Sequence, residues 1–161
     1  MRLRSVILGL VLLVFAASAS WLAVYGFLIS QEDYSPERGS LRYYVGISSL
    51  IRNAPATGTM AQPTYFGSVG DGNKPPQSEM TFETSAKDIT EATAALTSYL
   101  RQKDFHQRSI EAENAAASFV PEGERLVQYA QYASSAGEVA VLAVTQAIAT
   151  GLCKVTLTHY D

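Results

Sequence analysis

An uncharged apolar run from Val6 to Ile29 limits how this chain can fold more than any other stretch. As an α-helix with a rise of ~1.5 Å per residue, these 24 residues would be about 36 Å long. That length exceeds the roughly 30 Å hydrocarbon core of a bilayer, so the helix can span it with some tilt. We therefore expect residues 1–29 to form a transmembrane signal-anchor.

The same segment has a second reading, as a cleaved signal peptide. Arg2 and Arg4 form a basic start, and Ala17-Ser18-Ala19 matches an A-x-A cleavage site. Cleavage there would leave an exposed apolar tail from Ser20 to Ile29. Because the apolar run continues past the cleavage motif, the pattern favours the uncleaved anchor, and the signal peptide stays as the alternative.

Charge on either side of the run predicts the orientation. Arg2 and Arg4 precede it, whereas Glu32 and Asp33 follow it. Positive residues favour the cytoplasmic side, so we expect a single-pass protein with a cytoplasmic N-terminus and an extracytoplasmic domain. No glycosylation sequon occurs, which is compatible with a bacterial inner membrane facing the periplasm.

Composition excludes several partners for the rest of the chain, which we divide into a linker (30–40) and a domain (41–161). Removing Arg2 and Arg4 from the 12 basic residues leaves ten against 15 acidic residues. Without a basic cluster, nucleic acid is not expected as a partner. The glycines before Lys74 do not match a phosphate-binding loop, because Asn73 intervenes and two prolines follow, so no nucleotide is expected.

Alternating apolar residues predict most of the domain to be β-structure. The expected strands are Leu41–Ile51, Met80–Ala86, Arg125–Ala133, Glu138–Gln146 and Cys153–Tyr160. The last three form a meander with short turns. Residues 54–79 hold four of the six prolines and four glycines, which predicts an irregular loop with a possible short strand at Thr64–Phe66.

One helix is well specified in the domain. Asp88 and Glu91 form a predicted capping pair, and apolar residues recur at helical spacing from Ile89 to Leu100. We expect this helix to end around Asp104, whereas 107–119 fits a helix or a strand. The predicted fold class is α+β: an N-terminal transmembrane helix, then a two-layer domain, mostly antiparallel sheet with one main helix packed on one face.

Few residues suggest chemistry. His159 and Cys153 lie six residues apart, about 20 Å along a straight strand, which is too far for a nucleophilic pair. A metal site would have to recruit His106, Asp104, His159 and Asp161, and no ligand spacing supports it. We predict no catalytic residue, no cofactor and no metal, and we read Cys153 as a buried apolar residue.

Aromatic residues are the candidates for protein contacts. Tyrosine and phenylalanine combine apolar area with rigidity, and tyrosine adds a polar tip. The predicted interaction residues are Tyr65, Phe66, Tyr129 and Tyr132, of which the last two lie on opposite faces of one strand. The alternative reading is ordinary sheet propensity.

These observations predict a membrane-anchored extracytoplasmic protein-interaction module, more in keeping with a non-catalytic protein than with an enzyme. An accessory subunit or an immunity-type protein of the bacterial envelope fits this description, with a protein partner in the envelope. One alternative is a small envelope hydrolase with a site at loop 54–79 and a histidine. Another is a periplasmic sensor of a small ligand.

Overall fold

The computed structural model describes residues 2–29, 33–70, 74–108 and 120–160, without the side chains of 2–8, 25 and 27–29. The chain divides into two compact units, Met1–Glu32 and Asp33–Asp161. The first unit holds helix α1 (Arg2–Ile29), in which every described side chain is exposed. Among the residues whose side chains are described, no helix combines the length and the apolarity needed to cross a membrane.

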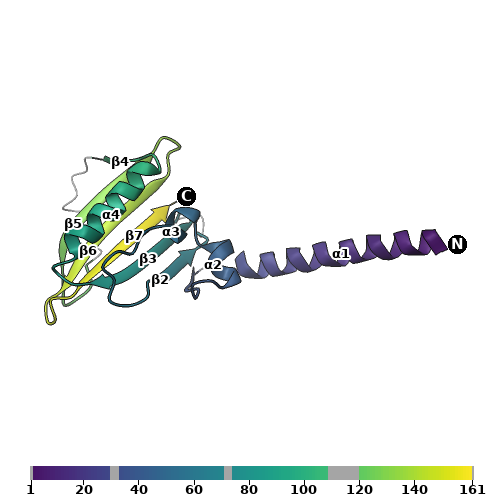
Figure 1. Cartoon of the computed structure of the whole chain (residues 1–161), viewed down its shortest axis with the longest axis horizontal. Coiled ribbons are helices and arrows are strands. Elements are labelled where there is room, and N and C mark those ends of the chain that lie inside the picture. Colours follow the sequence, from purple (N-terminus) through teal and green to yellow (C-terminus); the bar gives the residue numbers. More distant parts are fainter. Residues whose placement is uncertain (1, 30–32, 71–73, 109–119, 161) are drawn as a thin grey trace. The chain divides into compact units, whose positions relative to one another are not determined.

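Over the residues described, the second unit is an α+β fold built on one antiparallel sheet of seven strands (Figure 1). The strands are β1 (Asp33–Tyr34), β2 (Thr64–Ser68), β3 (Gln77–Thr84), β4 (Phe105–Arg108), β5 (Glu124–Ser134), β6 (Val139–Ala147) and β7 (Cys153–Tyr160). Their spatial order is β1-β2-β3-β7-β6-β5-β4, so the chain returns with β7 to the middle of the sheet. The predicted antiparallel sheet and the C-terminal meander are confirmed.

In the described part of this unit, three helices accompany the sheet: α2 (Leu41–Gly46), α3 (Ser49–Arg52) and α4 (Ile89–Gln102). Figure 1 shows α4 lying along the sheet as its main helix. The apolar stripe of α4 is buried at Ala92, Leu96 and Leu100. The Tyr99 hydroxyl donates to the Leu50 carbonyl at 2.8 Å, which links α4 to α3. The predicted packing of one main helix on one face is therefore confirmed.

The core lies between this helical layer and the sheet. Met80 on β3, Leu157 on β7 and Leu142 on β6 are opposite one another in the strand register, and all three are fully buried. Met80 and Leu142 alternate with partly exposed neighbours, which follows the two-residue period of a strand. One face of the sheet is thereby committed to the core.

The predicted strand at Leu41–Ile51 is wrong, because this stretch forms α2 and α3. Serine side chains cap both helices: Ser40 accepts from the Tyr43 amide at 3.2 Å and Ser48 from the Ile51 amide at 3.4 Å. The buried residues are Tyr43, Ile47, Leu50 and Ile51, which follow helical rather than alternating spacing. Capping therefore outweighed the strand-like alternation.

The capping pair predicted for α4 is also wrong. Asp88 is the N-cap residue, but its side chain makes no capping hydrogen bond. Its carboxylate instead accepts from the Ser85 hydroxyl at 2.7 Å, and Ser85 also accepts from the amides of Lys87 and Asp88. The helix ends at Gln102, because Asp104 takes a left-handed conformation with φ of 66° that turns the chain into β4.

Two other boundaries differ from the prediction. Strand β1 lies within the expected linker 30–40, so the folded unit begins at Asp33. The loop predicted at 54–79 contains β2, which confirms the possible short strand at Thr64–Phe66, and also the start of β3, with Tyr65 buried in the core. In the ambiguous stretch 107–119, the first two residues belong to β4, and 109–119 lie outside the described residues.

Candidate functional site

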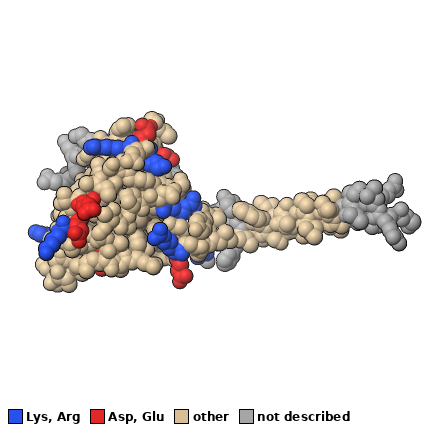
Figure 2. All heavy atoms as spheres, viewed as in Figure 1, with Lys and Arg blue, Asp and Glu red and all other residues tan. Residues whose placement is uncertain are grey.

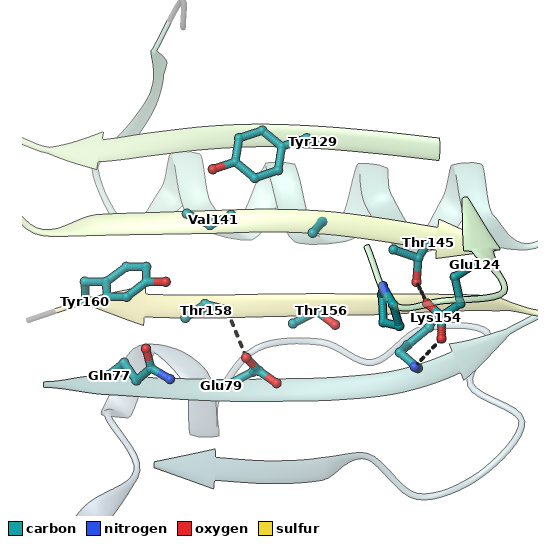
Figure 3. Close-up of a pocket in the computed structure, with 12 residues that line it drawn as sticks. Gln77, Glu79, Glu124, Tyr129, Val141, Thr145, Lys154, Thr156, Thr158 and Tyr160 are labelled. Carbon is teal, nitrogen blue, oxygen red and sulfur yellow. Dashed lines mark hydrogen bonds and ion pairs between the residues drawn. The ribbon is translucent and has the colours of Figure 1, made fainter. Parts of the chain in front are cut away.

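The candidate site is a hollow of about 260 Å³ on the face of the sheet opposite the helices (Figure 3). Strands β3, β7, β6 and β5 build its floor, and Pro121 contributes to its wall. Figure 3 looks onto this face, with the main helix behind the strands. Along each strand, the side chains that line the hollow alternate with those that form the core. The two-residue period of the strands therefore places the hollow on one face of the sheet and the core on the other.

One end of the hollow is organised around Glu79 of β3. Its carboxylate accepts hydrogen bonds from the hydroxyls of Thr81 at 3.1 Å and Thr158 at 3.3 Å. The Thr81 and Thr156 hydroxyls lie 3.2 Å apart on neighbouring strands. These hydroxyls hold the carboxylate against the sheet, because a hydrogen bond to an ionised acceptor is stronger than one between neutral groups.

Tyr160 lies next to this carboxylate. Burial raises the pKa of its phenol, and the negative charge of Glu79 and then the proximity of Tyr129 raise it further. A raised pKa keeps the phenol neutral and able to donate a hydrogen bond across the physiological range. This end of the hollow thus combines an anionic group with the phenol of Tyr160, whereas Tyr129 lies further across the sheet, on β5 (Figure 3).

The other end of the hollow contains an ion pair. Lys154 Nζ lies 2.7 Å from Glu124 Oε1, and the Thr145 hydroxyl donates to Glu124 Oε2. The hydrogen bond from Lys154, and next that from Thr145, holds the pKa of the Glu124 carboxyl below its usual value. The side chain of Glu124 is only 16% exposed, whereas that of Lys154 is 39% exposed. The charges of this pair therefore offset each other at the rim.

We expect Glu124→Gln to weaken the dependence of stability on pH in the acid range. Because the pKa of Glu124 is lowered by folding, the stability it contributes is present above its unfolded value, near 4.5, and is lost as the pH falls through the folded value. At neutral pH the variant should be less stable by on the order of 1 kcal/mol, since the pair is partly exposed. Urea unfolding between pH 3 and pH 7 measures both effects.

The control is Glu122→Gln, which removes an exposed carboxylate two residues away. It should leave the acid slope unchanged. Equal slopes for the two variants and the parent chain would contradict the assigned role of Glu124.

The structure separates the four predicted interaction residues. Tyr132 is 1% exposed and Tyr65 is 6% exposed, so both belong to the core. The Tyr132 hydroxyl lies 3.1 Å from that of Thr97, and the ring of Tyr65 packs edge-on to Tyr43. Burial raises the pKa of Tyr65 to about 12. Tyr129 lines the hollow and Phe66 is partly exposed, and the two faces predicted for Tyr129 and Tyr132 are confirmed.

The two histidines lie elsewhere. His159 is buried on the core face, with Nδ1 3.0 Å from the Ser48 hydroxyl and its ring edge-on to Phe105. His106 is exposed, with Nε2 3.2 Å from Asp104 Oδ1. The Ser135 hydroxyl donates to the other oxygen of Asp104 and is the main cause of the lowered pKa of that carboxyl. Neither histidine lines the hollow.

The remaining candidates are not brought together as a site. Cys153 is buried at the start of β7, as predicted. Asp161 lies outside the described residues, and within the described ranges no group of three or more metal-ligating side chains occurs. The residues that the sequence did not single out are Glu79, Thr158 and Tyr160. Strand alternation places them on the outward face, but only the pairing of β3 with β7 brings them together.

The chain was compared with protein-family models, curated proteins and solved structures, and none of them matches it.

Proposed function

We propose that this chain is a membrane-anchored, extracytoplasmic protein-interaction module, acting without catalysis as an accessory subunit or immunity-type protein of the bacterial envelope. Residues 6–29 would hold it in the inner membrane, and the unit from Asp33 to Asp161 would lie in the periplasm. The observation that carries the anchor is the uncharged run of 24 residues, over which helix α1 continues without a break. Basic residues before it and acidic residues after it support the orientation.

The described side chains of α1 support an apolar environment for this helix. Large apolar residues are exposed at successive positions around it, among them Leu12, Leu13, Val14 and Phe15, and its described side chains include no charged one (Figure 2). A helix that is apolar all round is stable when lipid or protein covers it. The length of the uncharged run is sufficient to span the hydrocarbon core of a bilayer, which favours lipid as the surrounding of this helix.

The second unit supports a binding role. Its open sheet face presents aromatic, hydroxyl and charged side chains around one hollow. Neither histidine lies there, and the hollow is not enclosed between helix and sheet. These placements favour a contact surface over the hydrolase and sensor alternatives.

Two arginines in the middle of α1 should remove the protein from the membrane. We expect Leu13→Arg/Ala16→Arg to abolish retention in an alkali-washed membrane pellet, because each arginine near the centre of a span costs about 2.5–3.5 kcal/mol. The matched control Leu13→Ile/Ala16→Leu should remain in the pellet. Recovery of the unaltered chain in the soluble fraction would refute the anchor. An intact mass beginning at Ser20 would show cleavage instead.

The binding role is tested by cross-linking in the intact envelope. A photoreactive residue at Thr156, on the floor of the hollow, should form an adduct with another protein. The same residue at the exposed Glu91 of α4, on the other side of the sheet, serves as the control. A cross-link pattern at Thr156 that contains only the chain itself would remove the support for a heterologous partner.

A further inference from the structure

The charges around the hollow do not cancel. Among the residues that the structure describes, the lining side chains that carry a charge at neutral pH are Glu79, Glu124 and Lys154. Within the described ranges the ion pairs are Lys154–Glu124 and His106–Asp104, so Glu79 takes part in neither. Its hydrogen-bond donors, Thr81 and Thr158, are neutral. The hollow therefore carries one negative charge in excess, concentrated on the Glu79 carboxylate.

The strand register places apolar and aromatic surface beside this carboxylate. Glu79 lies opposite Thr158, which in turn lies opposite Val141 on β6. With strands about 4.8 Å apart, Val141 is about 10 Å from Glu79 across the floor. Tyr160, two residues along β7 from Thr158, lies beside this path, and Tyr129 lies on β5, beyond Val141 (Figure 3). A short apolar floor thus leads to a carboxylate beside the ring of Tyr160.

This combination selects a class of ligand. A carboxylate attracts a cation, and tyrosine rings attract the same charge through their electron-rich faces. The apolar floor suits a hydrocarbon stem. At about 260 Å³ the hollow is smaller than the roughly 300–1,000 Å³ of sites for drug-sized ligands, so it fits a single side chain or a small amine.

We propose that the hollow binds an alkylammonium or guanidinium group on an apolar stem, the chemistry of a lysine or arginine side chain and of a free polyamine. The Glu79 carboxylate binds the cation, Tyr160 lies beside the charge, and Val141 and Tyr129 contact the stem. Where the cation belongs to a partner protein, the inference rests on the proposed function, because the same face then carries the protein contact.

Titration of the full chain in a non-ionic detergent tests this assignment. The probes are Nα-acetyl-lysine methylamide, its uncharged norleucine analogue and putrescine, with binding followed by NMR shifts of the methyl groups. Lysine or putrescine should bind at least tenfold more tightly than the norleucine compound. That factor corresponds to about 1.4 kcal/mol for one ion pair in a partly enclosed site. Equal binding of the norleucine compound would overturn the proposal.

Two substitutions on β3 provide the matched comparison. Glu79→Gln should weaken binding of the cation at least tenfold, because it removes the charge and keeps the shape. Glu83→Gln removes an exposed carboxylate from the same strand, outside the hollow, and should change affinity less than twofold. Equal losses in both variants would mean that general charge, and not this hollow, attracts the probe. Unchanged melting temperatures verify that both variants are folded.

The tyrosine contribution has its own comparison. Tyr160→Phe keeps the ring and should stay within twofold of the parent chain, whereas Tyr160→Leu should weaken binding about three- to fivefold. If the lysine compound binds more tightly than putrescine, the cation comes from a protein side chain. If putrescine binds more tightly than the lysine compound, the cation comes from a free amine. If no cation binds while Thr156 still cross-links to a partner, the inference fails and the proposed function stands.

Discussion

Replacing Leu157 by alanine should lower the free energy of unfolding by about 2–5 kcal/mol, the largest effect that we expect from a single substitution in this chain. Leu157 is fully buried at the centre of β7, the middle strand of the sheet. It lies between Met80 and Leu142 in the register, and both are also fully buried. Because Met80 and Leu142 are held on the neighbouring strands, they cannot move into the space that the shorter side chain leaves. The cost of this cavity therefore adds to the lost burial of the leucine side chain.

Urea unfolding of the full chain in detergent, followed by tyrosine fluorescence, measures this loss. The control is Ile148→Ala, which deletes a comparable apolar side chain that is 71% exposed at the β6–β7 turn. It should change the free energy of unfolding by less than about 0.5 kcal/mol. Similar losses for the two variants would show that the register assigned to β7 is wrong.

Replacing Gly67 by alanine should cost about 1–3 kcal/mol, because it would push Tyr34 out of its position. A Cβ atom on Gly67 would lie 2.4 Å from the ring of Tyr34, and one on Gly46 would lie 2.6 Å from it. The Tyr34 ring is buried between these glycines, and its hydroxyl donates to the Gly46 carbonyl at 2.7 Å. This ring ties β1 to both β2 and the end of α2.

A double-mutant cycle identifies the cause. In a Tyr34→Ala background the ring is absent, so Gly67→Ala should lose most of its destabilising effect. Gly39→Ala is not a suitable control, because Gly39 has a positive φ that penalises alanine without any contact. Additive losses from Tyr34→Ala and Gly67→Ala would contradict a steric conflict between them.

The C-terminal meander could be predicted from local patterns alone. Along β7, Val155 and Leu157 alternate with Lys154 and Thr156, and the alternation identifies the strand and its two faces. The stripe of α4 from Ala92 to Leu100 is equally local, because residues three and four apart share one face of a helix. Such elements depend on neighbours within a few residues, which the sequence displays directly.

The stretch from Leu41 to Ile51 shows where local patterns conflict. It carries both an alternating and a helical arrangement of apolar residues, and the serines at positions 40 and 48 cap two short helices. The burial pattern agrees with the helical arrangement, because Tyr43 and Ile51 are buried in the core whereas Leu41 is 57% exposed. Whether such a segment forms a helix or a strand depends on the surface against which it packs. That surface is formed by residues far away in the sequence.

The hollow could not be predicted in this way. Its charged end joins Glu79 to Thr158, which is 79 residues further along the chain, and its other end joins Glu124 to Lys154. The amino-acid sequence thus decides the uncharged N-terminal run, the charge balance and which residues of each strand share a face. The tertiary structure decides which strands are neighbours, because register depends on a shared core, and it alone brings one excess carboxylate and two tyrosines to a common surface.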